Sequence, residues 1–418
     1  VTVSPSTTFN VTSGDAFELT SYAGITFTNN NPEVTIAGAV DGIQAANSGD
    51  GALSITTTGT TTGTSGDGIY AYNDANGGLT INAATTTGGN DGIKAYNKGS
   101  SALSITTTGM TTGTSDDGID AFNGYIYNGS VYGTSLTINA ATTKGGDDGI
   151  YAYNYGTGAL SITTTGTTTG TSGNGINAYN SSAGTSLTIN AATTTGATDG
   201  IDAYNIGSGA LSITTTGTTT GTIGINAQNG YNYYGSVYGT SLTINAATTT
   251  GGNYGIFADN TGTGALSITT TGTTTGTNKD GINAKNGYIY YDSVYGTSLT
   301  INAATTTGGN YGIFADNIGS GALSITTTGT TTGAKYDGIK ANNSSAGTSL
   351  TINASTTTGG VDGINALNSG TGALSITTSG AITGGTGYGI RARTAANKTS
   401  NITLNSGTVV SSTAGLGI

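Results

Sequence analysis

Residues 68–73 read Gly-Ile-Tyr-Ala-Tyr-Asn and residues 92–97 read Gly-Ile-Lys-Ala-Tyr-Asn, two copies of a hexad, Gly-Ile-x-Ala-x-Asn, that recurs along the chain. Successive copies begin 24 to 31 residues apart. The fourteen copies begin at Gly42, Gly68, Gly92, Gly118, Gly149, Gly175, Gly200, Gly224, Gly255, Gly281, Gly312, Gly338, Gly363 and Gly389. Only the last departs from the pattern, with Thr394 in place of Asn. A period of about 25 residues is typical of a solenoid, in which each repeat packs against its neighbours.

Each repeat contains stretches with the period of two that is typical of a β-strand. In the hexad, Ile and Ala alternate with variable residues. A second alternating stretch follows, as in Leu-Ser-Ile-Thr-Thr at 53–57 or Leu-Thr-Ile-Asn-Ala at 79–83, and then a Thr-Thr-Thr-Gly segment. Three short strands with Gly and Asn corners make one turn of a parallel β-helix. We therefore predict an all-β protein, a β-solenoid of about 15 turns with roughly 25 residues in each.

The repeats also predict the domain organisation. Residues 1–40, which hold both Pro and both Glu of the chain, are expected to form an N-terminal cap on the coil. Residues 41–418 form the repeats, in which the two versions of the second strand alternate, so the repeating unit is a pair of turns. Three Tyr-rich inserts interrupt them at 124–135, 230–241 and 287–298. The chain ends on the first two residues of another hexad, and we expect the natural protein to continue.

The composition excludes several classes of function. The 418 residues include no Cys and no His, so there is no disulfide, zinc finger or Ser-His-Asp triad. A net charge of −11, with Arg only at 391 and 393, argues against nucleic-acid binding. The lysines are scattered and the aspartates recur with the repeat, which is typical of a scaffold. We assign no catalytic residue, cofactor or metal ligand and predict a non-enzymatic protein; a polysaccharide lyase or hydrolase is the lesser alternative.

Thirteen hexads end in Asn, and this predicts a ladder of stacked amides at one corner of the coil, each bonding to the next. The residues are Asn47, Asn73, Asn97, Asn123, Asn154, Asn180, Asn205, Asn229, Asn260, Asn286, Asn317, Asn343 and Asn368. We predict a structural role for this ladder.

Nine hexads are preceded by Asp, and the first five of these lie on consecutive turns. The residues are Asp41, Asp67, Asp91, Asp117, Asp148, Asp199, Asp280, Asp337 and Asp362. Asp before Gly is typical of a turn in which the carboxylate bonds to its own backbone. The alternative is that a cation such as Ca²⁺ relieves the repulsion between stacked carboxylates. The sequence leaves open whether the column binds calcium.

A stripe of aromatic side chains is predicted on the outer face of six consecutive hexad strands. Its residues are Tyr72, Tyr96, Phe122, Tyr153, Tyr179 and Tyr204. They lie four residues after the hexad Gly, where a period of two turns side chains away from the core. One interpretation is aromatic stacking that stiffens a parallel sheet. The other is a platform for sugar rings or for a protein partner.

The three inserts carry the other candidate for recognition. Each follows the Asn corner, and together they contain eleven of the 24 tyrosines of the chain. These are Tyr125, Tyr127, Tyr132, Tyr231, Tyr233, Tyr234, Tyr238, Tyr288, Tyr290, Tyr291 and Tyr295. Tyr combined with Gly, Ser and Asn is the composition of adaptable binding loops. Duplication of one ancestral insert would also explain their similarity, without any function.

The alternating units Asp-Gly-Ile-x-Ala-x-Asn, Leu-Ser-Ile-Thr-Thr-Thr-Gly and Leu-Thr-Ile-Asn-Ala-Ala-Thr-Thr-Thr-Gly resemble the passenger domains of bacterial type V autotransporters of the adhesin-like subgroup. The resemblance covers residues 41–394 and rests on the repeats. It implies a right-handed β-helix, a signal peptide that has been removed, and a C-terminal translocator β-barrel in the full-length precursor. The absence of Cys suits a chain that is exported unfolded.

On this basis we expect a surface-exposed or secreted passenger, at the outer membrane of a Gram-negative bacterium, that binds host cells as an adhesin or virulence factor. Its partner would be a host cell-surface protein or glycan, and the protein would be monomeric. The alternative is a released ligand that activates a host cell-surface receptor, of the proangiogenic type. The identity of the partner, and whether the passenger stays attached, are not given by the sequence.

Overall fold

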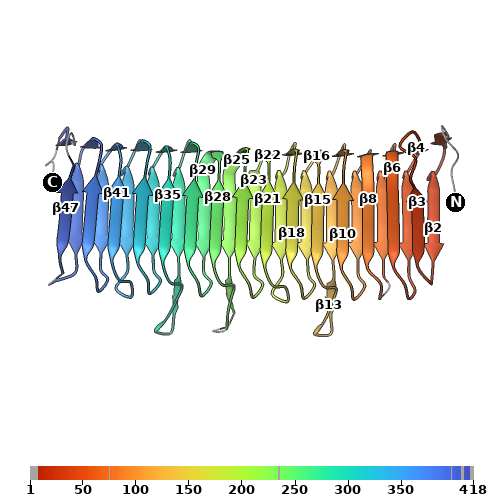
Figure 1. The fold of residues 1–418 in the computed structure, drawn as a ribbon, viewed down its shortest axis with the longest axis horizontal. Coiled ribbons are helices and arrows are strands. Elements are labelled where there is room, and N and C mark those ends of the chain that lie inside the picture. Colours follow the sequence, from red (N-terminus) through yellow and green to blue (C-terminus); the bar gives the residue numbers. More distant parts are fainter. Residues whose placement is uncertain (1–7, 75, 234–235, 397, 406–408, 415–418) are drawn as a thin grey trace. The chain divides into compact units, whose positions relative to one another are not determined.

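The structure is a computed structural model that describes residues 8–74, 76–233, 236–396, 398–405 and 409–414. The chain divides into two compact units, Val1–Ser208 and Gly209–Ile418, each of which is a stack of parallel β-coils (Figure 1). The coils are of the right-handed type, about 15 turns in all at roughly 26 residues per turn. The predicted β-solenoid is therefore confirmed. The described residues form no helix, and so none that is long and apolar enough to cross a membrane.

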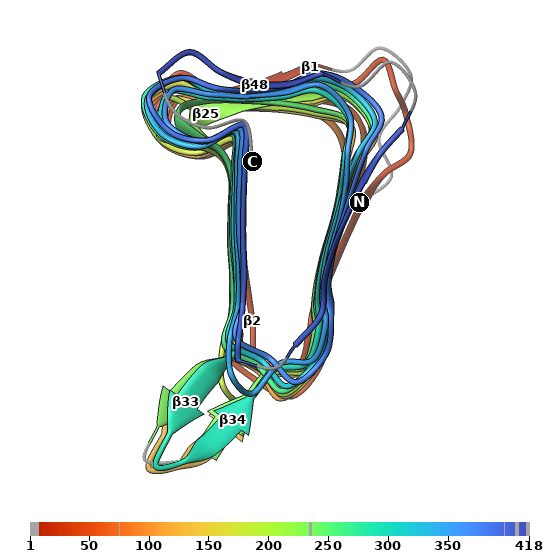
Figure 2. The ribbon, with the colours of Figure 1, turned by 90° about the vertical axis from the view of Figure 1, so that its left-hand side faces the viewer.

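Each turn has three sides, which we call the first, second and third strands in the order hexad, Leu-x-Ile stretch and Thr-Thr-Gly segment (Figure 2). In unit 1 the first strands are β2 (Phe17–Ser21), β5 (Ile43–Asn47), β7 (Ile69–Asn73), β9 (Ile93–Asn97), β12 (Ile119–Asn123), β17 (Ile150–Asn154), β20 (Ile176–Asn180) and β23 (Asp199–Asn205). The second strands are β3 (Ile25–Asn29), β6 (Leu53–Gly63), β8 (Leu79–Gly88), β10 (Leu103–Thr107), β15 (Leu136–Ala140), β18 (Leu160–Thr164) and β21 (Leu187–Ala191). The third strands are β1 (Thr8–Asn10), β4 (Thr35–Gly38), β11 (Met110–Gly113), β16 (Thr142–Gly145), β19 (Thr167–Gly170) and β22 (Thr193–Thr195), while β6 and β8 continue into this side.

Unit 2 repeats the arrangement. Its second strands are β24 (Leu211–Thr215), β28 (Leu242–Ala246), β30 (Leu266–Thr270), β35 (Leu299–Ala303), β38 (Leu323–Thr327), β41 (Leu350–Ala354), β44 (Leu374–Thr378) and β47 (Ser400–Leu404). The third strands are β25 (Thr218–Asn229) and β29 (Thr248–Asn260), which both continue into the first side, and β31 (Thr274–Gly276), β36 (Thr306–Gly308), β39 (Thr331–Gly333), β42 (Thr357–Gly359), β45 (Ile382–Gly384) and β48 (Val410–Ser412). The remaining first strands are β32 (Ile282–Asn286), β37 (Ile313–Asn317), β40 (Ile339–Asn343), β43 (Ile364–Asn368) and β46 (Ile390–Thr394).

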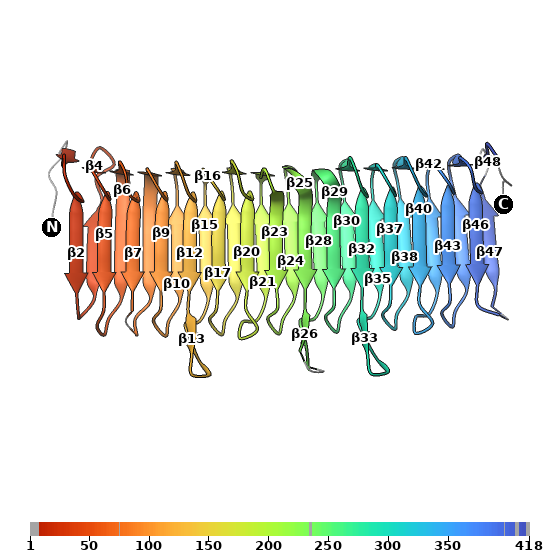
Figure 3. The ribbon, with the colours of Figure 1, turned by 180° about the vertical axis from the view of Figure 1, so that it is seen from behind.

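Strands of the same side pair in parallel, and each residue faces its counterpart one turn on. Between β7 and β9, for example, Ile69 pairs with Ile93 and Asn73 with Asn97. The first strands of unit 1 therefore lie side by side in register (Figure 3). This register stacks identical side chains on one another.

The core is a set of these stacked columns. Ile and Ala of the first strand, and Leu and Ile of the second, are almost completely buried in every full turn of each unit. Because strands lie about 4.8 Å apart, each buried side chain packs against its equivalents above and below. The stability of each unit is therefore a sum of contacts between neighbouring turns.

Glycines at the corner between the third and first strands are required by the close approach of the backbone. A Cβ added at Gly113 would lie 2.0 Å from the carbonyl oxygen of Asp117, and one at Gly118 would lie 2.5 Å from the carbonyl oxygen of Gly149. Neither distance is compatible with a side chain. The Thr-Thr-Gly and Asp-Gly-Ile motifs thus mark the corner between the third and first strands.

The predicted amide ladder is confirmed in both units. The side-chain Nδ2 of Asn97 donates to Oδ1 of Asn123 at 2.8 Å, and Asn123 donates in the same way to Asn154 at 2.8 Å. The second proton of Asn97 goes to the carbonyl oxygen of Ser101, at 2.8 Å, on its own turn. Asn97 and Asn123 are at most 1% exposed. The ladder therefore satisfies buried amides and also fixes the corner from which the inserts depart.

The alternation between the two kinds of turn has a physical basis at the next corner. A second strand that ends in Thr lies against neighbours that end in Ala, as Thr107 does against Ala83 and Thr164 against Ala140. The Thr107 hydroxyl accepts a hydrogen bond from the backbone N–H of Ala141, at 3.3 Å, on the following turn. The same contact joins other Thr turns to the Ala turns that follow them in both units. One turn supplies a hydroxyl and the next supplies the amide.

Candidate binding site

The first insert folds as a hairpin of strands β13 (Tyr125–Tyr127) and β14 (Ser130–Tyr132), which we call hairpin 1. The two strands are antiparallel, and Tyr125 faces Tyr132 across the base, with ring centroids 4.7 Å apart and planes 10° apart. At the tip, Asn128 and Gly129 have φ of 48° and 78°. This is the Asn-Gly pattern of a tight type I′ turn, which matches the twist of the strands.

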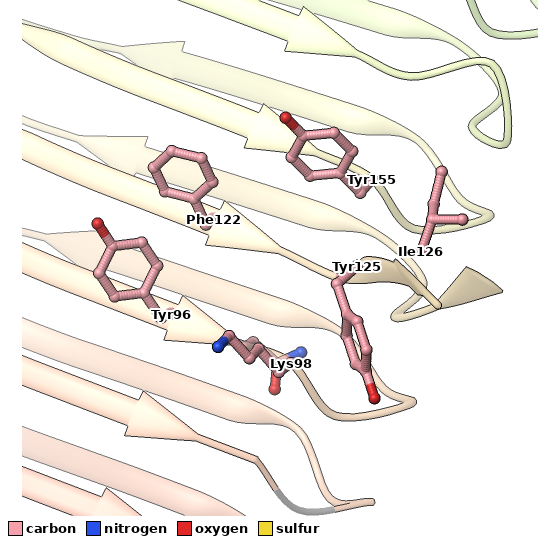
Figure 4. Close-up of a pocket in the computed structure, with 8 residues that line it drawn as sticks. Tyr96, Lys98, Phe122, Tyr125, Ile126 and Tyr155 are labelled. Carbon is pink, nitrogen blue, oxygen red and sulfur yellow. The ribbon is translucent and has the colours of Figure 1, made fainter. Parts of the chain in front are cut away.

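A pocket of about 370 Å³ lies where hairpin 1 meets the coil (Figure 4). Its lining residues are Tyr96, Asn97, Lys98, Phe122, Gly124, Tyr125, Ile126 and Tyr155. They come from the ends of β9, β12 and β17 on three successive turns, and from β13. Figure 4 shows Tyr125 extending from the hairpin next to Lys98, with Phe122 and Tyr155 standing on the coil. Half of the lining residues are aromatic, and the one charged residue among them is Lys98.

A partly buried polar network supports one wall of this pocket. The Tyr96 hydroxyl donates to Oδ2 of Asp120 at 3.0 Å, and the Lys94 ammonium lies 3.2 Å from the same oxygen and 2.7 Å from Oδ2 of Asp91. Burial alone would lower the pKa of Lys94, but the hydrogen bond with Asp91 and the charges of Asp91 and Asp120 outweigh it and raise the pKa. Burial raises the pKa of Asp120 to about 6, against the opposing charge of Lys94. The network holds the Tyr96 ring in place through its hydroxyl.

The aromatic stripe lies on the outer face of unit 1 as predicted, and its side chains are half-buried. From Tyr96 to Tyr204 consecutive rings contact one another, with centroid distances of 5.1 Å for Tyr96–Phe122, 5.4 Å for Phe122–Tyr153, 5.0 Å for Tyr153–Tyr179 and 5.8 Å for Tyr179–Tyr204. The ammonium of Lys98 lies 5.2 Å from the ring centre of Tyr72. Ring faces in the stripe are therefore largely covered by neighbouring rings, and this geometry favours the interpretation in which stacking stiffens the sheet.

Unit 2 carries the other two hairpins, which leave the coil at the same Asn corner (Figure 3). Hairpin 2 is formed by β26 (Tyr231–Tyr233) and β27 (Ser236–Tyr238), and hairpin 3 by β33 (Tyr288–Tyr290) and β34 (Ser293–Tyr295). In hairpin 2, Tyr231 faces Tyr238 across the base. Tyr234 lies outside the described residues, as does the side chain of Tyr233.

Hairpin 3 has the base of hairpin 1 but different surroundings. Tyr288 faces Tyr295, just as Tyr125 faces Tyr132. The positions that correspond to Tyr96, Phe122 and Tyr155 beside hairpin 1 are, in register, Asp259, Lys285 and Ile318 beside hairpin 3. The aromatic walls of the pocket are therefore specific to hairpin 1 when these two hairpins are compared.

The tip of hairpin 3 also differs. Tyr291 and Asp292 occupy the two turn positions, with φ of 42° and 66°. Positive φ is unfavourable for residues with a side chain, and most of all for a bulky one. Tyr291 is 84% exposed, and its ring contacts that of Tyr290 edge-on with centroids 4.4 Å apart.

The Asp column forms a ladder between turns. The Oδ1 atoms of Asp67, Asp91 and Asp117 accept the backbone N–H of the equivalent residue on the following turn, at 2.8 to 3.0 Å. Asn174 occupies one place in the column, and its Oδ1 accepts the N–H of Asp199 at 2.9 Å. The prediction that each Asp bonds to its own backbone is therefore wrong for these residues. The parallel register brings the N–H of the next turn to the carboxylate instead.

Carboxylates of the turn that carries hairpin 1 crowd against those of the turns on either side. Carboxylate oxygens of Asp91, Asp117 and Asp120 lie within 4.8 Å of one another, as do those of Asp116, Asp117 and Asp147. Burial raises the pKa of Asp117 to about 8; the hydrogen bond from Asp148 opposes this shift, and neighbouring carboxylates add to it. On the turn that carries hairpin 3, burial raises the pKa of Asp280, and the Asn283 amide, which donates to its Oδ2 at 2.7 Å, opposes that shift.

The structure brings together three of the predicted site residues, Tyr96, Phe122 and Tyr125, in one pocket. Tyr127 and Tyr291 point to solvent near the hairpin tips. The sequence did not single out Lys98, Ile126 or Tyr155 as pocket residues. Tyr155 follows the corner Asn154 directly, and an aromatic in that place is the signal that would have indicated it.

Comparison of the chain with protein families, with characterised proteins and with solved structures gives no match.

Proposed function

We propose that the protein is a non-enzymatic binding protein of the autotransporter-passenger type, surface-exposed or secreted, that attaches to host cells through its hairpins. The repeat pattern and the β-solenoid fold, which is the fold of such passengers, support the assignment to this type. The coil is a scaffold, because its residues are accounted for by columns, ladders and tight corners. The three hairpins are not needed to build the coil, and we therefore assign recognition to them.

The observation that carries the proposal is where exposed apolar side chains occur. Among the described residues ten large apolar side chains are exposed, and half of them lie on the three short hairpins. These five are Ile126, Tyr127, Tyr231, Ile289 and Tyr291. Exposed apolar groups on segments that add nothing to the core are typical of a protein interaction site.

Hairpin 1 is the principal contact in this proposal. Its pocket has an aromatic lining and a volume of about 370 Å³, within the range of sites that bind small ligands or anchor a side chain of a partner. In the part of the stripe beyond the pocket, by contrast, the ring of Tyr153 stacks between those of Phe122 and Tyr179. The pocket therefore supports binding of an apolar group of a host cell-surface protein better than stacking of a row of sugar rings.

Replacement of hairpin 1 by a corner that the protein already uses provides the test. Residues 181–183, Ser-Ser-Ala, connect an Asn corner to Gly-Thr-Ser-Leu in a turn without an insert. Residues 124–132 occupy the same place and are replaced by Ser-Ser-Ala. The matched control makes the same replacement at 287–295. Circular dichroism and thermal melting establish that both variants are folded.

We expect the replacement in hairpin 1 to reduce binding to cultured host cells at least about tenfold, and the control to reduce it by less than about threefold. Arrays of glycans and of host ectodomains then identify the class of partner. Unchanged cell binding by the folded hairpin 1 variant contradicts the proposal. Receptor phosphorylation in cells treated with the purified protein would indicate the released-ligand function instead of simple attachment.

A further inference from the structure

A column of buried threonine hydroxyls runs through the third strands of each unit. In unit 1 the residues are Thr61, Thr86, Thr111, Thr143, Thr168 and Thr194, and in unit 2 they are Thr219, Thr249, Thr274, Thr306 and Thr331. All are at most 1% exposed, and each pairs in register with the next within its unit. Their Oγ1 atoms have no hydrogen-bond partner among the described residues.

The fold does not impose Thr at this position. Ile36 pairs in register with Thr61 in unit 1, and Ile382 pairs with Thr357 in unit 2. Both isoleucines are at most 1% exposed. The column therefore accepts an apolar β-branched residue, and Val has the shape of Thr without the hydroxyl. A buried hydroxyl without a partner is unfavourable, and here it recurs turn after turn.

The methyl group of each Thr has a defined place. In unit 1, Cγ2 of Thr168 lies 2.7 Å from the position that a Cβ would take at Gly149. Cγ2 of Thr111 lies 2.7 Å from the position that a Cβ would take at Gly92. The methyl thus packs against the hexad Gly, where the backbone leaves room. With the methyl placed there, the hydroxyl is directed elsewhere in the interior.

The distance between threonine hydroxyls on adjacent strands suits a bridging water molecule. Equivalent atoms on adjacent strands lie about 4.8 Å apart, too far for a direct hydroxyl–hydroxyl hydrogen bond of about 2.8 Å. A water oxygen set about 1.4 Å to the side of the line between two hydroxyls lies about 2.8 Å from both. Each hydroxyl both donates and accepts, so it can serve the water above it and the water below it.

We infer that the threonine column of each unit binds a file of internal water molecules, one between each pair of adjacent hydroxyls. Buried waters commonly make two to four hydrogen bonds to polar groups that lack other partners. The column supplies two such groups to every water. This site is independent of the hairpins and of any binding partner.

Substitution of Thr168, which lies between Thr143 and Thr194, tests the inference. Thr168→Val removes the hydroxyl and keeps the shape, whereas Thr168→Ser keeps the hydroxyl. The matched control is Thr169→Val on the same strand, where the side chain is half-buried on the outer face. Melting temperatures are measured for the full chain, and the wild type is crystallised for a high-resolution map.

We expect Thr168→Val to lower the melting temperature by about 2–4 °C and the triple change at Thr143, Thr168 and Thr194 to lower it further, with little effect of Thr169→Val. The map would show ordered solvent about 2.8 Å from pairs of Oγ1 atoms. An unchanged or higher melting temperature for Thr168→Val would overturn the inference, because the hydroxyl would then be unpaired. A map with no solvent along the column would overturn it equally.

Discussion

Hairpins 1 and 3 have nearly the same sequence, but the residues of the coil beside them differ. The turn of hairpin 1 combines Asp117, Asp120 and Phe122 before its corner Asn, whereas the turn of hairpin 3 has Asp280, Asn283 and Lys285 in the same places. In both hairpins two tyrosines pair across the base, and the hairpin leaves the coil directly after an Asn of the ladder. The difference therefore lies in what the coil presents next to the hairpin: an aromatic pocket and crowded carboxylates in one turn, charged residues and a relieved carboxylate in the other.

This comparison shows that a repeated insert does not imply a repeated site. The hairpin sequence alone would assign the same function to both copies. The outward positions of the coil, which the core does not constrain, decide whether a hairpin closes over a pocket. Recognition in a solenoid is thus assembled from two sources, an insert and the exposed residues of the turns beside it.

The largest effect is expected from loss of the ladder Asn at the base of each hairpin, and it should be equal in the two turns. Asn123→Ala and Asn286→Ala each remove a buried amide that bonds to the next Asn of the ladder, at 2.8 Å and 3.0 Å, and to a carbonyl at 3.2 Å. We expect each change to lower the free energy of unfolding by about 2–4 kcal/mol, since it leaves buried partners unpaired. Urea denaturation measures both. A difference of more than about 1 kcal/mol between them would show that the two hairpins are not held by the same base.

The carboxylates provide a pH-dependent difference between the two turns. The pKa of Asp117 is about 8 in the folded protein and about 3.9 when unfolded, so the folded state binds more protons between these values. Stability therefore falls as the pH rises from about 4 to 8. Asp117→Asn, which reproduces the Asn174 arrangement, is expected to raise the stability at pH 8 by about 1–2 kcal/mol and to change it little at pH 4.

The matched variant for this prediction is Asp280→Asn. The pKa of Asp280 is also raised by burial, but the Asn283 amide and the Tyr311 N–H oppose that shift. We expect a smaller gain at pH 8. Denaturation midpoints at pH 4, 6 and 8 make the comparison, and a wild-type-like pH profile in Asp117→Asn would contradict the assignment of the shift to Asp117.

The role of the pocket in binding is tested by removing one equivalent ring from each of hairpins 1 and 3. Tyr125→Ala removes a wall of the pocket and is expected to weaken binding to host cells about tenfold. Tyr288→Ala removes the equivalent ring of hairpin 3, where the positions beside the hairpin are Asp259 and Lys285, and is expected to change binding by less than about twofold. Equal losses in the two variants would indicate that the hairpins, and not the pocket, carry recognition.

The smallest effect is expected at the hairpin tips. Tyr291→Asn combined with Asp292→Gly gives hairpin 3 the Asn-Gly tip of hairpin 1 and relieves two positive φ angles. We expect this to stabilise the hairpin by about 1 kcal/mol, which corresponds to roughly fivefold slower amide exchange in β33 and β34. The reverse change, Asn128→Tyr with Gly129→Asp, should accelerate exchange in β13 and β14. No change in either direction would mean that the tip is held by other contacts.

The fold was predictable because each turn of the coil packs against turns of nearly the same sequence. In a parallel coil with one turn per repeat, residues at the same place in the repeat become neighbours, so the Asn ladder follows directly from the spacing of the hexads. The same register predicts that Lys94 and Asp120 face each other, which the structure shows. The hydrogen-bond donor to the Asp column was predicted wrongly, because the donor was expected on the same turn and the structure places it on the following turn.

The pocket was only partly predictable. Phe122 and Tyr96 lie in the repeat and could be placed on the outer face, but the contribution of Ile126 and Tyr155 depends on the direction in which hairpin 1 leaves the corner. That direction is set by Gly124 and Gly133, with φ of 79° and 84°. The repeat pattern contains no information about these angles, because the insert is what interrupts the repeat.

The alternation of Thr and Ala at the second corner has a consequence for how such a chain can change in length. The Thr hydroxyl oxygen of one turn accepts a hydrogen bond from the backbone N–H of the Ala turn that follows, as Thr107 does from Ala141 and Thr270 from Ala304. Loss or gain of a single turn by recombination between repeats would place two turns of the same kind together and leave a pair of threonines, or a pair of alanines, face to face. Gain or loss of two turns restores every contact. Natural length variants of this protein should therefore differ by even numbers of turns.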